Sequence, residues 1–175
     1  MRFHKWATIA AVLALMVGCI AIPKSRTYYE PNSADGKLIQ SASCGWNTTA
    51  LDAIERDVDG ITLSVYPKYD NEHPFRVYVL LGRTSKMVGI DPDKLEVRFS
   101  DGAASVRPST SSVEDAGPYA FKSINYVFSS SLEASEIAIT FLPGFIRLDG
   151  KDNETIQFRF RRVTKFDVYY GSINC

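Results

Sequence analysis

The sequence has few histidines and cysteines and lacks the motifs of common enzyme classes. Its 175 residues include two histidines, His4 and His73, and three cysteines. It has no Gly-x-Ser-x-Gly turn, no His-Glu-x-x-His helix, no phosphate-binding glycine loop and no serine followed three residues later by lysine. A catalytic triad would depend on His73, because proton transfer near neutral pH normally uses imidazole. We interpret His73 as an exposed loop residue, so the sequence favours a protein that is not an enzyme and needs no cofactor.

An excess of charge of one sign is also lacking. The chain has 20 basic and 20 acidic residues, whereas a general nucleic-acid binder normally carries a basic surface. After the first 22 residues no apolar run approaches the length of a membrane span, and there is no internal repeat or low-complexity tract. We therefore expect no nucleic-acid partner and a single domain.

The most informative segment is the N-terminal leader. Arg2 and Lys5 precede an apolar run over 6–17. The end of this run and the two residues after it read Leu15-Met16-Val17-Gly18-Cys19, and Pro23 follows. A positive head, a short apolar body and a small residue before the break are typical of a secretory signal peptide. We predict a signal peptide over 1–18.

The end of this leader resembles the lipobox of bacterial lipoprotein precursors, with Met16 where the family usually has leucine. The resemblance covers the leader alone. It implies that a dedicated peptidase cuts before Cys19 and that lipid is attached to this cysteine. Because Ile20 rather than aspartate follows, it also implies an outer-membrane location with the domain facing the periplasm. The membrane is then a partner through the anchor at Cys19.

Two alternatives to lipidation stay open. The apolar stretch over 6–22 has 17 residues, which is at the short limit for an uncleaved anchor in a bilayer of about 30 Å. Ordinary signal cleavage after Ala21 would place Cys19 at one of the positions that need small residues.

The cysteine count agrees with lipidation. An odd number in an exported protein leaves one thiol to be explained, and lipid on Cys19 explains it. Cys44 and Cys175 are then predicted to form a disulfide, since such bonds persist in oxidising compartments. The alternative is two separate free thiols. Two cysteines and one histidine do not complete a structural zinc site.

The predicted organisation has three parts: a signal peptide over 1–18, a lipid-anchored tether over 19–43 and a β-domain over 44–175. The tether is rich in proline and turn formers and shows no sustained period. Its aromatic pair, Tyr28 and Tyr29, is expected to fold back onto the domain. Removal of Arg2 and Lys5 with the leader leaves 157 residues with a net charge of −2.

Alternation of apolar and polar residues dominates the chain after Asp59-Gly60. The clearest apolar sets are Ile61, Leu63 and Val65; Leu95, Val97 and Phe99; and Ile156, Phe158 and Phe160. Further strands are predicted over 76–82, 120–128, 136–142 and 165–170. Glycine turns separate many of them, at Asp35-Gly36, Asp59-Gly60, Asp101-Gly102, Pro143-Gly144 and Asp149-Gly150.

This pattern predicts an all-β fold, an antiparallel two-sheet sandwich of immunoglobulin-like architecture, with a small β-barrel as the alternative. The immunoglobulin spacing of cysteines and tryptophan is absent, so only the architecture is predicted. At most one short helix is expected near the start, because Leu51, Ile54 and Val58 follow Thr49 at a spacing that allows one or two helical turns.

Two acidic clusters precede or surround glycines. They are Glu55, Asp57 and Asp59 before Gly60, and Asp149, Asp152 and Glu154 around Gly150. Calcium prefers six to eight oxygen ligands, but neither cluster has the twelve-residue loop pattern. Aspartate before glycine is common in turns, so we predict turns here and no metal site.

The most basic surface feature is the stretch 157–165. If Phe158 and Phe160 point inward, then Arg159 and Arg161 share the outer face, with Arg162 and Lys165 near the next turn. Guanidinium groups suit phosphate or carboxylate ligands, so these four residues form a candidate patch for an anionic ligand or partner. The alternative, which we favour, is a solvated strand face whose arginines pair with Glu96, Glu136 or Asp167.

The sequence thus predicts a lipid-anchored envelope protein that binds a protein or glycan partner without catalysis. The alternative function is a hydrolase that attacks cell-wall or surface polysaccharide with a pair of carboxylates. The lack of histidine, glycine-loop and metal motifs favours the binding module.

Overall fold

The computed structural model describes residues 20–43, 46–69, 74–100, 105–115, 117, 122–129 and 134–171. The predicted signal peptide, the three cysteines, His73 and the Asp101-Gly102 turn all lie outside these residues. Within the described ranges, no helix has the length and apolar character that crossing a membrane requires.

One of the two six-stranded sheets, sheet A, is built around one long strand, β15. Sheet A contains β1 (Ile20–Pro31), β3 (Ala42–Ser43), β4 (Trp46–Thr48), β9 (Leu95–Phe99), β12 (Glu136–Phe141) and β15 (Ile156–Gly171). The order is β3-β4-β15-β12-β9, and β1 pairs with β15 as well. All these pairs are antiparallel.

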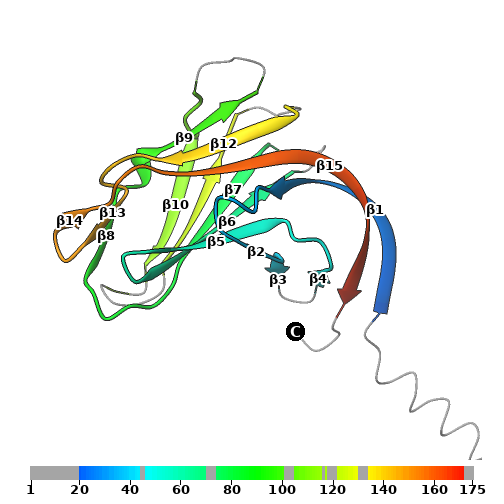
Figure 1. The fold of residues 1–175 in the computed structure, drawn as a ribbon, viewed down its shortest axis with the longest axis horizontal. Coiled ribbons are helices and arrows are strands. Elements are labelled where there is room, and N and C mark those ends of the chain that lie inside the picture. Colours follow the sequence, from blue (N-terminus) through cyan, green and yellow to red (C-terminus); the bar gives the residue numbers. More distant parts are fainter. Residues whose placement is uncertain are drawn as a thin grey trace, which may run out of the picture.

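Sheet B forms the second layer. Its order is β10-β11-β7-β6-β5-β2, from β10 (Thr110–Asp115), β11 (Lys122–Val127), β7 (Arg76–Leu81), β6 (Ile61–Lys68), β5 (Ala53–Val58) and β2 (Lys37–Ile39). A small sheet C joins β14 (Lys151–Asp152), β13 (Ile146–Leu148) and β8 (Val88–Ile90) at one end of the molecule (Figure 1). A 3-10 turn, η1 (Pro92–Lys94), precedes β9. The predicted antiparallel sandwich is confirmed, and the described strands do not close into a barrel.

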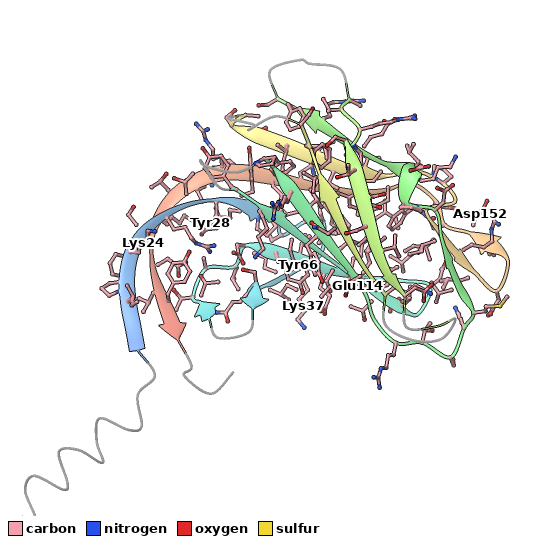
Figure 2. All side chains as sticks on the ribbon, turned by 180° about the vertical axis from the view of Figure 1, so that it is seen from behind. Lys24, Tyr28, Lys37, Tyr66, Glu114 and Asp152 are labelled. Carbon is pink, nitrogen blue, oxygen red and sulfur yellow. The ribbon has the colours of Figure 1, made fainter. Side chains whose placement is uncertain are left out.

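One apolar core fills the space between the two main sheets (Figure 2). Sheet A contributes Leu95, Val97, Phe99, Ile137, Ile139, Phe141, Ile156, Phe158 and Phe160, and sheet B contributes Ile54, Ile61, Leu63, Val65, Val77, Val79, Leu81, Ile124 and Tyr126. The alternating positions predicted over 61–65, 95–99 and 156–160 all lie in this core. Full burial of each large apolar side chain stabilises the fold by about 1.5–3 kcal/mol.

Glycine turns connect several strands as expected. Asp59 and Gly60 have φ angles of 53° and 89°, and Asp149 and Gly150 have 50° and 83°. Two successive positive φ angles are the geometry of the tight hairpin turn that suits the twist of antiparallel strands. These pairs join β5 to β6 and β13 to β14.

The tether predicted over 19–43 is corrected by the structure for residues 20–43. These residues contain β1, β2 and β3, and β1 pairs with β15 along its whole length, from Ile20 opposite Gly171 to Pro31 opposite Phe160. Tyr28 and Tyr29 are 6% and 0% exposed, which confirms that this pair packs on the domain. Sequence analysis missed β1 because its partner lies more than 100 residues away and the segment lacks alternation.

The helical turns that the spacing after Thr49 allows are not present in the structure. Leu51 lies outside any helix or strand just before β5, and Ile54 and Val58 belong to β5. Ile54 is buried in the core opposite Val65 of β6, whereas Leu51 is 42% exposed. The helical spacing of these residues does not determine their conformation. Pairing with β6 does, because packing against a neighbouring strand outweighs the local pattern.

Strand β15 joins two segments that were predicted as separate strands, 156–161 and 165–170. Its first half pairs with β12, and its last residues pair with β4 on the same edge. β1 and β15 therefore continue past the sandwich as a curved two-stranded arm (Figure 1). Lys24 and Tyr28 lie on this arm (Figure 2).

Candidate functional site

The predicted basic patch lies on the outer face of sheet A. Strand β12 runs between β9 and β15, and its register places Ala138 directly between Arg98 and Arg159. Residues that are opposite one another in neighbouring strands share a face of the sheet. These three residues therefore form a row with an arginine at each end and a methyl group in the middle. We call it the arginine row.

A second row lies beside the first. Glu136 of β12 is opposite Arg161 of β15, and Arg161 is opposite Glu30 of β1. Charges of opposite sign thus alternate across three strands, an arrangement that stabilises the sheet locally. We call it the glutamate row.

A groove of about 680 Å³ lies against both rows. Its walls come from β1 and the turn that follows, from Leu38 and from strands β9, β12 and β15. Five of its lining residues are charged: Glu30, Arg98, Glu136, Arg159 and Arg161. The groove therefore combines guanidinium donors with carboxylate acceptors over a floor that includes Ala138.

Arg159 is fixed by Asp35 from the turn after β1. Its Nε and Nη2 atoms donate to the two carboxylate oxygens of Asp35 at 3.0 and 2.6 Å, and its backbone N–H donates at 2.8 Å. These hydrogen bonds hold the pKa of Asp35 below its usual range. The Arg159 side chain is nevertheless 54% exposed, so the guanidinium is held in place and still faces solvent.

Arg161 and Lys165 share one carboxylate. Both form ion pairs with Glu30, and the Arg161 Nη2 to Glu30 Oε2 distance is 3.4 Å. The hydrogen bond from Lys165 is the main reason that the pKa of Glu30 is lowered. Arg162 lies elsewhere, because it is one residue out of phase with Arg161 on the strand. It lies over the Tyr69 ring, with its guanidinium carbon 5.8 Å from the ring centroid.

The structure thus brings Arg159, Arg161 and Lys165 together and separates Arg162 from them. The expected Glu136 is opposite Arg161 in the neighbouring strand, but the ion pairs of the patch are formed with other acids. Glu30 and Asp35 take this part, while Glu96 pairs with Arg107 and Asp167 pairs with Arg26. Both partners come from the segment that was predicted to be a tether, so sequence reasoning had no means to place them.

Arg98 is the residue that sequence analysis overlooked. It is exposed and forms no ion pair with any residue in the described ranges. The alternation of Leu95, Val97 and Phe99 already placed it on the outer face of a strand. Its neighbour across the sheet was not predictable, because register between distant strands is not encoded in local pattern.

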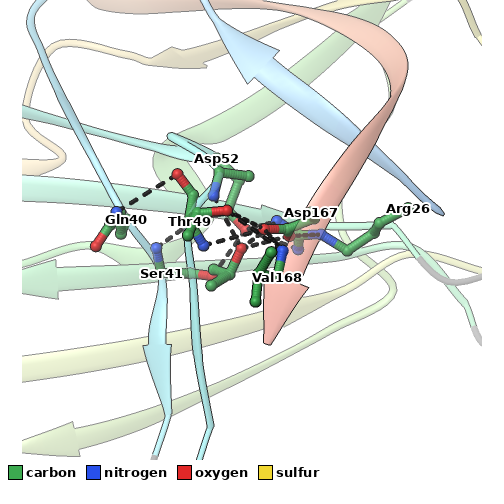
Figure 3. Close-up of polar contacts among 9 residues, drawn as sticks. Arg26, Gln40, Ser41, Thr49, Asp52, Asp167 and Val168 are labelled. Carbon is green, nitrogen blue, oxygen red and sulfur yellow. Dashed lines mark hydrogen bonds and ion pairs between the residues drawn. The ribbon is translucent and has the colours of Figure 1, made fainter. Parts of the chain in front are cut away.

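A second polar cluster lies where the arm meets the short strands (Figure 3). Asp167 of β15 has a fully buried side chain and accepts hydrogen bonds from the Thr48 hydroxyl and from the Thr49 hydroxyl and backbone N–H. The Arg26 Nε atom lies 2.9 Å from its Oδ2 atom as an ion pair. Burial of Asp167 opposes ionisation, but these hydrogen bonds and the Arg26 charge outweigh it, so its pKa is lowered.

Asp52 completes this cluster from the other side of Arg26. Its Oδ2 atom accepts hydrogen bonds from Nη1 and Nη2 of Arg26, both at 2.9 Å. The Ser41 backbone N–H and hydroxyl also donate to Asp52, each at 2.7 Å. Arg26 is further covered by the Tyr28 ring, whose centroid is 4.8 Å away.

The Asp52–Arg26–Asp167 cluster brings two carboxylates to one arginine. Both carboxylates are buried, and each accepts several hydrogen bonds besides the contact with Arg26. A general acid needs a raised pKa, whereas that of Asp167 is lowered. The geometry is that of a structural clamp that ties β1 and β15 to β4 and to the start of β5.

The acidic turns are used within the fold. Asp57 accepts a hydrogen bond from the Gly60 backbone, Asp149 accepts one from the Met87 backbone, and Asp152 pairs with Arg147. Among the described residues no group of three or more histidine, cysteine, aspartate or glutamate side chains is arranged to hold a metal ion. No family model, curated protein or solved structure matches this chain.

Proposed function

We propose that this protein is a lipid-anchored lipoprotein of the cell envelope, joined to the membrane through Cys19, that presents a rigid β-sandwich to an envelope protein or glycan without catalysing a reaction. The lipobox-like leader supports the anchor. The observation that carries the proposal is the position of β1, which begins at Ile20 and pairs with β15 throughout. A lipid on Cys19 would therefore be attached one residue from the folded domain.

Such a short connection has a mechanical consequence. A flexible tether of many residues would let the domain sample a wide volume above the membrane. A strand that starts one residue after the anchor instead confines the domain close to the bilayer surface. Confinement raises the effective concentration of the domain for partners in the same membrane or in the adjacent layer. A binding or structural role benefits from this arrangement.

The buried carboxylates support the proposal that the protein is non-catalytic. Asp52 and Asp167 are saturated by hydrogen bonds and by one shared arginine, and they lie where the arm meets the short strands. Neither is arranged to protonate a leaving group or to activate water, which a polysaccharide hydrolase requires of its two acids.

We also propose the disulfide between Cys44 and Cys175. Trp46, two residues after Cys44, is opposite Gly171, four residues before Cys175, in the β4–β15 pair. The segments that lead from β4 to Cys44 and from β15 to Cys175 thus leave from neighbouring strands. In the chain-entropy model, a bond that closes a loop of more than 100 residues stabilises the fold by up to about 5 kcal/mol.

The proposed location is the outer membrane, with the domain in the periplasm. It is tested by producing the full precursor in a two-membrane bacterium and separating inner membrane, outer membrane and soluble fractions. The wild-type protein is expected in the outer membrane, and Cys19→Ala is expected to leave it. Equal distribution of the two proteins among the fractions would contradict lipid anchoring. Cross-linking in intact cells, followed by purification from the outer membrane, then identifies the partner.

A further inference from the structure

The arginine row leaves an open space between two guanidinium groups. Neighbouring strands lie about 4.8 Å apart, so Arg98 and Arg159 begin about 10 Å apart across Ala138. The side chain between them is a single methyl group, and the groove passes over it. A larger residue at this position would fill the floor. The space is wide enough for a ligand group that both arginines reach.

The charges around this space are unevenly balanced. Arg159 is balanced by Asp35, and the two positive charges of Arg161 and Lys165 balance Glu30 and Glu136. Arg98 has no ionic partner among the described residues and is exposed at the groove. One positive charge is therefore left over, and a planar guanidinium fork pairs best with a carboxylate or phosphate.

The two glutamates restrict what the ligand is. A polyanion that followed the groove would bring its other charges against Glu30 and Glu136, and like charges repel. Carboxylates are, however, good acceptors for hydroxyl groups, and Asn32, Ser33 and Ser100 add neutral donors and acceptors to the lining. A ligand with one acidic group among many hydroxyls satisfies both conditions.

Apolar contact is available as well. Pro31 and Leu38 line the groove beside the polar groups. The carbon-bound hydrogens of a sugar ring pack on such surfaces, while its hydroxyls turn toward polar side chains. An acidic peptide lacks this distribution of hydroxyls around an apolar ring.

We propose that this groove binds a carboxylate-bearing saccharide, with Arg98 and Arg159 on either side of the carboxylate and with Glu30 and Glu136 accepting from sugar hydroxyls. The proposal rests on the non-catalytic binding role above and names its ligand class. Arg98 supplies the unbalanced charge, Arg159 a preorganised donor, and Ala138 the space.

Isothermal titration of the full protein, purified in detergent, tests this site with two acidic probes. They are the methyl glycoside of glucuronic acid and the disaccharide of N-acetylglucosamine and N-acetylmuramic acid. Each has a single carboxylate and is compared with its methyl ester, which has the same sugar without the charge. Binding of at least one acid and at least tenfold weaker binding of its ester are expected. If neither acid binds, or if the esters bind equally well, the proposal is overturned.

Three variants locate the binding. Arg98→Gln is expected to weaken affinity about tenfold or more, since a hydrogen bond to a charged group is lost, and it spares the fold because Arg98 is exposed. Ala138→Leu, which fills the floor, is expected to weaken it similarly. Arg76→Gln, on an exposed position of β7 away from the groove, is the matched control and should stay within about twofold. Unchanged affinity in Arg98→Gln overturns the assignment.

The same experiment separates this proposal from the wider one. If a probe is bound and also cleaved, the non-catalytic role fails, while loss of binding in Arg98→Gln still supports the groove. If no probe binds, the groove proposal fails, and the fractionation of Cys19→Ala remains an independent test of the anchor.

Discussion

Ile20 lies directly opposite Gly171 at the far end of the arm formed by β1 and β15. The first and last described residues of the chain are therefore neighbours, and β4 pairs with the same end of β15 through Trp46. An anchor at Cys19 and a disulfide between Cys44 and Cys175 would both act at this end of the molecule. The candidate saccharide groove lies on sheet A, where β15 pairs with β12.

Substitution of Tyr29 tests whether β1 is part of the folded domain. Its side chain is fully buried, its ring contacts Phe75 at 5.8 Å between centroids, and its hydroxyl donates to the Ala134 carbonyl. Tyr29→Ala is expected to lower the free energy of unfolding by about 3–5 kcal/mol. Phe166→Ala, at a position 74% exposed, is the control and should change it by less than about 0.5 kcal/mol. Urea unfolding measures both, and equal small effects would show that β1 does not belong to the core.

A substitution of Asp167 tests the clamp that ties the arm to β4 and to the start of β5. Asp167→Asn removes the charge that pairs with Arg26 and disturbs the hydrogen bonds from Thr48 and Thr49. Because the group is buried, a loss of about 2–4 kcal/mol in the free energy of unfolding is expected. Asp152→Asn breaks an exposed pair with Arg147 and should cost less than about 1 kcal/mol. Similar losses in the two variants would contradict the proposed difference between buried and exposed pairs.

The lowered pKa values of Asp167, Asp35 and Glu30 predict how stability depends on acid. A carboxylate whose pKa is lower in the folded state stabilises the fold above its unfolded pKa of about 4, and this contribution is lost as pH falls through the folded pKa. The contribution of these groups to the free energy of unfolding should therefore vary little between pH 7 and about 5, and it should decrease below about pH 4. In Asp167→Asn the decrease should be shallower, because one such group is gone. An identical acid slope in the variant and the wild-type protein would argue against a lowered pKa at Asp167.

The strands with clear alternation could be predicted from the sequence because the alternation of apolar residues and the turn before it are both local features. Ile61, Leu63 and Val65 bury one face while Thr62, Ser64 and Tyr66 alternate with them, and Asp59-Gly60 marks the turn before them. The short strands and β1 show no such pattern. The partners of β1, β4 and β8 lie far along the chain, and the pairing energy that fixes these strands comes from tertiary contacts.

The candidate site was predictable in part for the same reason. Arg159 and Arg161 were placed on one outer face by the inward positions of Phe158 and Phe160. The groove was not predictable, because it depends on the register of β12 against β9 and β15, which puts the small Ala138 between two arginines. The acids that hold Arg159 and Arg161 come from a segment with no strand signal. A one-residue change of register would remove the arginine row altogether.

The proposed disulfide predicts matched behaviour of its two cysteines. In protein purified without reductant, neither Cys44 nor Cys175 should react with maleimide after unfolding, and both should react once a reductant is added. Cys44→Ser and the double variant Cys44→Ser/Cys175→Ser should each lose about 2–4 kcal/mol of stability, since either one removes the same bond. Two reactive thiols without reductant would show that the bond is absent.

The mass of the N-terminal peptide tests the central claim most directly. Protein extracted from membranes is digested, and the peptide that contains residue 19 is identified by mass spectrometry. We predict that it begins at Cys19 and carries the added mass of fatty acyl chains on that residue. A peptide that begins at another residue, or an unmodified Cys19 at the N-terminus, would contradict the lipid anchor and the placement of the domain at the membrane surface.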